Sequence, residues 1–168
     1  MADGSVVDRA AHVRLLCVDV DGVLTDAGMY YGRDGEVLKK FNARDGHGLQ
    51  RVREAGIAVA IVSKEDSAIV HARAAKLNID DVFCGATNKR LAIDELCQRH
   101  HLDLAEVAFI GDDLNDLPAL ECVGLPCAVA DAVEPVRALA AYVTQHRGGD
   151  GAVREVCEFL IAARQAAS

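Results

Sequence analysis

The stretch from Leu15 to Asp26, LLCVDVDGVLTD, decides which fold the sequence predicts. Its first four residues are apolar at consecutive positions, which is typical of a parallel strand buried on both faces of a sheet. Asp19 and Asp21 follow where the chain leaves the sheet, and Gly22 permits a tight turn there. Two carboxylates this close repel each other unless a cation or a shared proton lies between them. The stretch therefore predicts a magnesium site or an acid/base pair, with an aspartate-rich turn as the alternative.

The length and composition of the chain predict one globular domain over residues 1–168. Hydrophobic residues make up 51% of the chain and charged residues 26%, and the six cysteines lack the CxxC spacing of metal or redox sites, so we expect reduced cysteines in a core. A net charge of -8 argues against nucleic acid as the partner. No apolar run approaches the roughly 18 residues of a membrane span, and no signal peptide is evident. These features predict a cytoplasmic enzyme or binding module without a membrane partner.

Two segments depart from a regular alternation of strands and helices. Residues 28–41 contain two strand-like runs on either side of Gly32–Gly35, which predicts a projecting β-hairpin with an edge suited to contacts between subunits, or else a mobile surface flap. Residues 147–168 begin with a glycine-rich run and end in an amphipathic helix. We interpret this C-terminal tail either as a hinge or as a flexible segment able to reach an active site.

Polar residues recur at the ends of the other predicted strands. Residues 57–62 form a buried strand that ends on Ser63, where an N-cap is the plainer interpretation and a phosphate contact the functional one. Residues 107–110 form another, followed by three carboxylates, Asp112, Asp113 and Asp116. Parallel strands place such residues at one edge of the sheet, where open α/β folds have their sites. We therefore expect a three-layer, Rossmann-like parallel sheet with helices on both faces.

Further elements complete this α/β pattern. The sequence predicts helices over residues 42–56, 67–77, 89–100, 133–140 and 151–164, and strands at 82–83, 127–130 and 142–144. Lys89 falls in the first turn of its helix, where a cation opposes the helix dipole. Arg44 lies near the start of the first of these helices, from which it could face the end of the Asp19 strand. A solvated side chain is the alternative for both residues.

The motifs DVDGVLTD and GDDLND, with Ser63 and Lys89 between them, resemble the four motifs of the haloacid dehalogenase superfamily. The hairpin in place of a large cap, and the ending GGDGAVREV, resemble its capless sugar-acid phosphatases. This resemblance covers residues 13–163. It implies a magnesium-dependent phosphoric monoester hydrolase acting through an aspartyl phosphate.

The resemblance also implies a role for each motif residue. Asp19 would be the nucleophile and Asp21 the acid/base, and Ser63 and Lys89 would hold the phosphate. Mg²⁺ would be bound by the Asp19 carboxylate, the Asp21 carbonyl and Asp112, with Asp113 and Asp116 in support.

Members of this group are similar in forming homotetramers in which a neighbouring subunit completes each site. Arg73 lies about 12 Å along the helix axis from Glu65, so the two could not easily hold one small sugar within a subunit. The resemblance implies that Arg73 binds substrate in the adjacent subunit's site. Lys64 and Glu65 replace the glycine and arginine typical of 3-deoxy-D-manno-octulosonate 8-phosphate phosphatases, and with Lys76 they resemble the phosphatases of nine-carbon ulosonate 9-phosphates. We therefore expect Glu65, Arg73, Lys76 and Arg44 to bind substrate, preferably a nine-carbon ulosonate 9-phosphate of the KDN or N-acetylneuraminate type. The octulosonate 8-phosphate is the alternative substrate, and a structural ion pair is the alternative role of Glu65.

Two proteins of other classes share part of this pattern. A signalling receiver domain also combines carboxylates, a hydroxyl and a lysine on a parallel sheet, but it needs neither an acid/base at Asp21 nor the hairpin. A non-catalytic assembly partner of a sugar-nucleotide synthetase is the second alternative. The presence of every motif residue argues against it.

Overall fold

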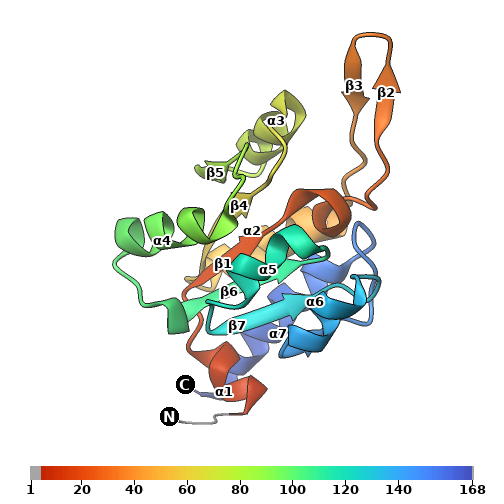
Figure 1. Ribbon diagram of the computed structural model, residues 1–168. Coiled ribbons are helices and arrows are strands. Elements are labelled where there is room, and N and C mark those ends of the chain that lie inside the picture. Colours follow the sequence, from red (N-terminus) through yellow and green to blue (C-terminus); the bar gives the residue numbers. More distant parts are fainter. Residues whose placement is uncertain (1–4, 168) are drawn as a thin grey trace.

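The computed structural model describes residues 5–167, and its centre is a six-stranded parallel sheet in the order β5-β4-β1-β6-β7-β8 (Figure 1). In that order the strands are Asp81–Phe83, Ala58–Val62, Leu15–Val18, Val107–Gly111, Leu125–Ala128 and Tyr142–Val143. All four residues of β1 are buried, as their apolar run predicts. Because β1 pairs with β4 on one side and β6 on the other, the strand that leads to Asp19 lies inside the sheet.

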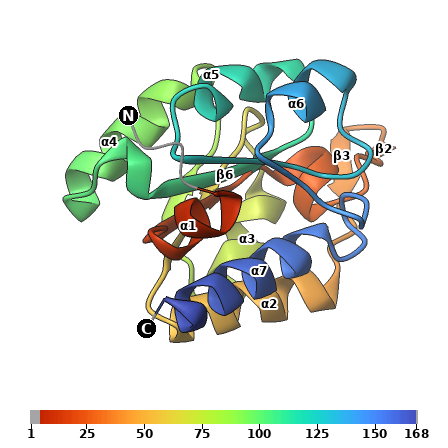
Figure 2. The same cartoon turned by 90° about the horizontal axis from the view of Figure 1, so that it is seen from below.

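Helices cover both faces of this sheet, which confirms the predicted α/β class (Figure 2). One face carries α1, α2 and α7, with α3 on the same side, and the other carries α4, α5 and α6. The helices are α1 Val6–Ala11, α2 Ala43–Glu54, α3 Ala68–Lys76, α4 Lys89–His100, α5 Leu117–Leu120, α6 Glu134–Leu139 and α7 Ala152–Ala166. Two short 3-10 turns, Leu104–Glu106 and Leu114–Asp116, flank β6. Among the described residues, no helix is both long and apolar enough to cross a membrane.

The predicted hairpin forms and stands away from the body of the molecule (Figure 1). Its strands are β2, Tyr30–Gly32, and β3, Gly35–Leu38, which pair only with each other. A helical turn with π-type hydrogen bonding, Val20–Leu24, leads from β1 toward it. An antiparallel bridge between Thr25 and Phe41 closes its base. The hairpin therefore starts and ends beside the loop that carries Asp21.

The described part of the C-terminal tail packs against the body of the molecule, beside the loop that carries Asp21, and its flexibility stays a prediction. The amide of Gly149 donates to the Val23 carbonyl at 2.9 Å. A Cβ at Gly148 would lie 1.7 Å from the Gly22 carbonyl oxygen, so only glycine allows these backbones to meet. Asp45 accepts from the backbone amide of Arg154 at 2.9 Å and so anchors the start of α7. Residues 147–151 thus form a fixed strap behind the Asp21 loop.

Elements α1, α5 and β7 differ from the sequence prediction. Helix α1 was not predicted, although Ser5 and Asp8 form the capping box that begins it. Strand β7 is Leu125–Ala128, whereas the sequence predicts a strand over residues 127–130. Proline lacks the amide that a sheet ladder uses. Pro126 nevertheless lies within β7, next to Phe109 of β6.

Candidate active site

Side chains that follow three strands converge on one cavity at the carboxyl edge of the sheet. Asp19 follows β1, Ser63 follows β4 and Asp112 follows β6, and the pairing of Val18 with Ile61 and Ile110 brings these three ends level. The cavity has a volume of about 450 Å³. Its lining residues are Asp19, Asp21, Ala27, Met29, Ser63, Lys64, Glu65, Asp112, Asp113, Leu114 and Asn115. The convergence that the motif spacing predicted is present in the structure.

Lys89 is buried beneath this cavity, at the first position of α4. Its side chain is 1% exposed, and its Nζ lies 2.7 Å from Oδ1 of Asp19 and 2.5 Å from Oδ1 of Asp116. A buried ammonium at a helix N-terminus is costly unless carboxylates compensate it. Burial acts to lower the pKa of Lys89, but Asp19 and Asp116 outweigh this effect and raise it. Lys89 therefore stays charged and fixes the Asp19 side chain.

The carboxylates of this site exceed the positive charge beside them. Burial, followed by the nearby Asp116 carboxylate, raises the pKa of Asp19 to about 7, although Lys89 acts to lower it. Burial and the carboxylates of Asp19, Asp116 and Asp113 raise the pKa of Asp112 to about 8. Each raised pKa means that the folded protein holds a proton, or needs a cation, to offset crowded negative charge. This electrostatic environment favours a divalent metal ion.

The donor set fits Mg²⁺, which prefers oxygen ligands. Carboxylate oxygens of Asp19, Asp112 and Asp116 lie within 4.8 Å of one another. Oδ1 of Asp112 is buried and has no hydrogen-bond partner among the described residues. A Cβ at Gly22 would lie only 1.9 Å from Oδ2 of Asp112, so glycine is what lets Asp112 approach the Asp21 loop. Asp112 is accordingly a carboxylate poised for a cation.

The two other carboxylates of the GDDLND motif mainly build the loop that presents Asp112. Asp116 is fully buried, accepts from Lys89, and also accepts from the amides of Asp112 at 2.8 Å and Asp113 at 3.2 Å. Asp113 accepts from the amide of Leu114 at 2.7 Å. These contacts already occupy both oxygens of Asp116, so they fit the supporting role expected of it rather than direct metal binding.

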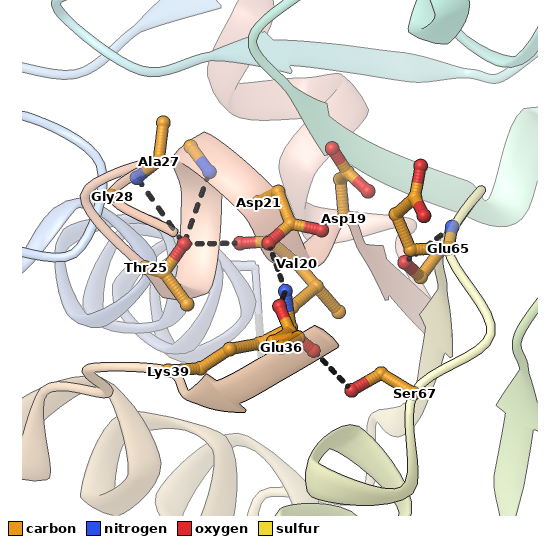
Figure 3. A network of polar contacts seen from close by, with 12 residues as sticks. Asp19, Val20, Asp21, Thr25, Ala27, Gly28, Glu36, Lys39, Glu65 and Ser67 are labelled. Carbon is orange, nitrogen blue, oxygen red and sulfur yellow. Dashed lines mark hydrogen bonds and ion pairs between the residues drawn. The ribbon is translucent and has the colours of Figure 1, made fainter. Parts of the chain in front are cut away.

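Asp21 has a partner that the sequence analysis did not identify. Oδ1 of Asp21 lies 2.6 Å from Nζ of Lys39, which follows β3 of the hairpin (Figure 3). The hydroxyl of Thr25 accepts from the amides of Gly22 and Ala27, both at 3.2 Å, and so holds the loop in shape. Lys39 and Lys40 look alike in sequence, but successive side chains of an extended segment point to opposite sides. Only Lys39 is directed inward.

The four predicted substrate-binding residues fall into two groups. Glu65 lines the cavity. The other three do not line it: Arg44 is exposed on the first turn of α2, Lys76 is exposed at the end of α3, and Arg73 packs its guanidinium 5.5 Å from the ring centre of Phe41. Arg44 therefore does not reach the cavity beyond the Asp19 strand within one chain, and its contact with substrate stays a prediction.

Comparisons with known proteins agree with this geometry. A sequence model of the haloacid dehalogenase-like hydrolases matches residues 64–156. The 3-deoxy-D-manno-octulosonate 8-phosphate phosphatase of Escherichia coli (strain K12) is 44% identical over 159 residues, which cover 95% of this chain and 85% of that protein. The crystal structure of the Yersinia pestis phosphatase of the same name has a TM-score of 0.93 at 43% identity and covers 95% of this chain and 86% of its own. The Moraxella catarrhalis phosphatase, crystallised with magnesium, phosphate and KDO, has a TM-score of 0.92 at 38% identity, with 95% and 92% covered.

Proposed function

Because the chain belongs to the haloacid dehalogenase-like hydrolases, and within them to the 3-deoxy-D-manno-octulosonate 8-phosphate phosphatase family, we propose that it hydrolyses 3-deoxy-D-manno-octulosonate 8-phosphate. Membership in this family makes it a phosphoric monoester hydrolase. The observation that supports this substrate is the 44% identity, over nearly the whole chain, to the 3-deoxy-D-manno-octulosonate 8-phosphate phosphatase of Escherichia coli. The cavity that joins Asp19, Asp21, Ser63 and Asp112 supplies the groups that such a reaction requires.

Asp19 is the proposed nucleophile. Its carboxylate oxygen attacks phosphorus, the bond from phosphorus to the sugar oxygen breaks, and an aspartyl phosphate forms. Lys89 holds Asp19 at 2.7 Å, which orients the attacking group, and Ser63 lies buried beside the same cavity. Ser63 and Lys89 together offer a hydroxyl and an ammonium to the oxygens of the phosphate. When Mg²⁺ is bound by Asp19, Asp112 and the Asp21 carbonyl, it supplies charge that offsets the phosphate and the carboxylates.

Asp21 is the proposed acid/base. In the first step it gives its proton to the leaving sugar alkoxide, which becomes a hydroxyl. In the second step it takes a proton from a water molecule, whose oxygen attacks phosphorus and breaks the bond to Asp19. Inorganic phosphate leaves, and both aspartates return to their starting states. Asp21 suits this role because it lines the cavity two residues beyond the nucleophile.

The nine-carbon ulosonate 9-phosphates remain the second candidate substrates. Glu65 lines the cavity beside Lys64, and a glutamate there reverses the charge of the arginine expected of an octulosonate phosphatase. The relatives described above are named for the octulosonate, so that substrate, which the sequence analysis held as the alternative, has the better support.

Phosphate release with Mg²⁺ tests both substrates. We expect kcat/KM for octulosonate 8-phosphate to be at least about tenfold that for KDN 9-phosphate and N-acetylneuraminate 9-phosphate, a transition-state difference of about 1.4 kcal/mol. Excess EDTA should remove the activity, and added Mg²⁺ should restore it. A preference for either nine-carbon substrate would support the second candidate. Inactivity on all three would contradict the proposed function and favour the non-catalytic assembly partner.

We also propose that the chain forms a homotetramer in which the hairpins pack together and a neighbour completes each site. Exposed apolar side chains gather on the hairpin, with exposures from 47% to 64%, at Met29, Tyr30, Tyr31, Val37 and Leu38. An isolated two-stranded hairpin is marginally stable, and such a patch is typical of an interaction surface. Arg73 does not line the cavity of its own chain, as expected if it binds substrate in the cavity of a neighbouring subunit.

Light scattering coupled to gel filtration tests this assembly. The purified chain should elute with about four times its 17.9 kDa mass. The double variant Tyr31→Asp, Leu38→Asp should elute as a smaller species, because packing the hairpins together would bury the introduced carboxylates. Val7→Asp is the matched control, since Val7 is 46% exposed on α1 and not on the hairpin. A monomeric wild-type chain would refute the proposal.

A further inference from the structure

A buried lysine joins the projecting hairpin to the active-site loop. The side chain of Lys39 is 0% exposed, and its Nζ lies 2.6 Å from Oδ1 of Asp21 and 2.6 Å from Oε1 of Glu36. Glu36 belongs to β3, whereas Asp21 follows β1. Figure 3 shows Lys39 and Glu36 between the Asp21 loop and the chain that enters α3. A lysine hidden to this degree requires carboxylate partners, and both are present.

The network continues beyond Glu36 to the segment that follows β4. Oε2 of Glu36 accepts from the hydroxyl of Ser67 at 2.9 Å, and Ser67 is the residue before α3. We name Asp21, Lys39, Glu36 and Ser67 the Lys39 network. It ties together three segments that are distant in sequence: the acid/base loop, the base of the hairpin, and the end of the loop that carries Glu65.

The neighbouring lysine shows that this arrangement is specific. Lys40 also forms an ion pair, with Asp26 at 2.5 Å, but its side chain is 60% exposed and that of Asp26 is 37% exposed. An exposed pair of this kind contributes little and leaves its partners mobile. In the pair of Lys39 with Asp21, the lysine side chain is 0% exposed and that of Asp21 is 24% exposed, so less water competes for the contact and it restricts the Asp21 rotamer more strongly.

We propose that Lys39 is a positioning residue that holds the Asp21 carboxyl group toward the reacting oxygens, while Glu36 and Ser67 hold Lys39 in place. The inference rests on the proposed function of Asp21. The contact with Lys39 uses Oδ1 of Asp21, which leaves Oδ2 to carry the transferred proton. Glu36 offsets the ammonium charge, so Lys39 orients Asp21 without placing a net positive charge beside a group that must hold a proton. Proton transfer needs this orientation because its rate depends on hydrogen-bond reach.

The choice of leaving group separates a positioning role from a merely structural one. A sugar alkoxide needs a proton from Asp21 as it leaves, whereas p-nitrophenolate is stable without one. A misplaced Asp21 therefore slows the first step for the sugar phosphate but spares it for p-nitrophenyl phosphate. The second step needs Asp21 as a base for either substrate. A variant without Lys39 should form the aspartyl phosphate from the aryl substrate and then hydrolyse it slowly.

The test compares Lys39→Met with Lys39→Arg and with Lys40→Met as the matched control. For Lys39→Met we expect kcat on octulosonate 8-phosphate to fall about 100-fold, the scale of general acid/base catalysis, with KM changed less than about threefold. Rapid mixing with p-nitrophenyl phosphate should give a burst of p-nitrophenolate close to the enzyme concentration, followed by slow turnover. Lys39→Arg should recover part of kcat, and Lys40→Met should match the wild type.

Several outcomes would overturn the proposal. The first is a Lys39→Met protein with wild-type kcat. The second is a Lys39→Met protein that loses activity equally on both substrates and gives no burst. The third is a Lys39→Arg protein whose kcat is no higher than that of Lys39→Met. If Lys39→Met does not fold by circular dichroism, Glu36→Gln provides the second test, with a smaller fall in kcat and a smaller burst expected. A wild-type enzyme inactive on both substrates would contradict the proposed function instead, so the two failures are distinguishable.

Discussion

Replacing Asp19 by asparagine is expected to abolish phosphate release. The amide has the shape of the carboxylate but cannot attack phosphorus, so the fall in kcat should exceed about 10⁴-fold. The fold should survive, because Lys89 keeps its contact with Asp116 at 2.5 Å. The pKa of Asp19 is raised to about 7, so its charge destabilises the metal-free protein above that pH. At pH 8 in EDTA, the variant should therefore be at least as stable as the wild type.

The measurement is steady-state phosphate release together with urea unfolding of the same preparations. Asp80→Asn is the matched control, because Asp80 is exposed and lies outside the cavity. It should leave both activity and stability unchanged. Magnesium-dependent turnover in a purified Asp19→Asn protein would remove the nucleophile assignment.

Replacing Lys89 by methionine should damage both activity and stability. The change leaves Asp19 and Asp116 buried without their shared cation, a loss of about 3–5 kcal/mol in the free energy of unfolding. Turnover should fall at least about 10³-fold, since the nucleophile loses its orienting partner and the phosphate loses a cation.

The stability loss should depend on pH in a defined direction. Lys89 acts to lower the pKa of Asp19, so its removal raises that pKa further above the unfolded value. A carboxyl group with a raised folded pKa binds protons more tightly in the folded state, and stability then falls as pH rises through the interval between the two values. The deficit should be larger at pH 8.5 than at pH 5.5 in EDTA, and added Mg²⁺ should reduce it. Urea unfolding at both pH values measures this loss in the free energy of unfolding, with Lys40→Met as the control. An equal loss at the two pH values would show that lost packing, not charge, is the cause.

The sequence predicted the sheet and the positions of the candidate catalytic residues because both follow local rules. Fully apolar runs form the buried strands, and polar residues directly after them must meet at one edge of a parallel sheet. That reasoning located Asp19, Ser63 and Asp112 correctly. The same reasoning could not distinguish Lys39 from Lys40, because their difference arises only when the base of the hairpin meets the Asp21 loop.

The expected substrate-binding residues stay predictions, for a related reason. Arg73 and Lys76 were assigned by resemblance and Arg44 from its place near the start of a helix, and none of the three lines the cavity of its own chain. Arg73 instead stacks on Phe41, a contact between segments that no local pattern encodes. The C-terminal tail shows a further limit: its glycines were interpreted as a hinge or a flexible segment, whereas the structure gives Gly148 and Gly149 another reason, the close approach of two backbones.

That close approach also sets the order in which the site can be completed during protein synthesis. The ribosome makes the Asp21 loop well before residues 147–151, whose backbone lies behind Gly22–Asp26. Strand β1 likewise has neighbours on both sides only after β6 has been made and has paired with it. Pairings this distant in sequence form late because they must close long loops. A nascent chain thus contains the proposed nucleophile, Asp19, long before residues 147–151 can complete the backbone behind the Asp21 loop.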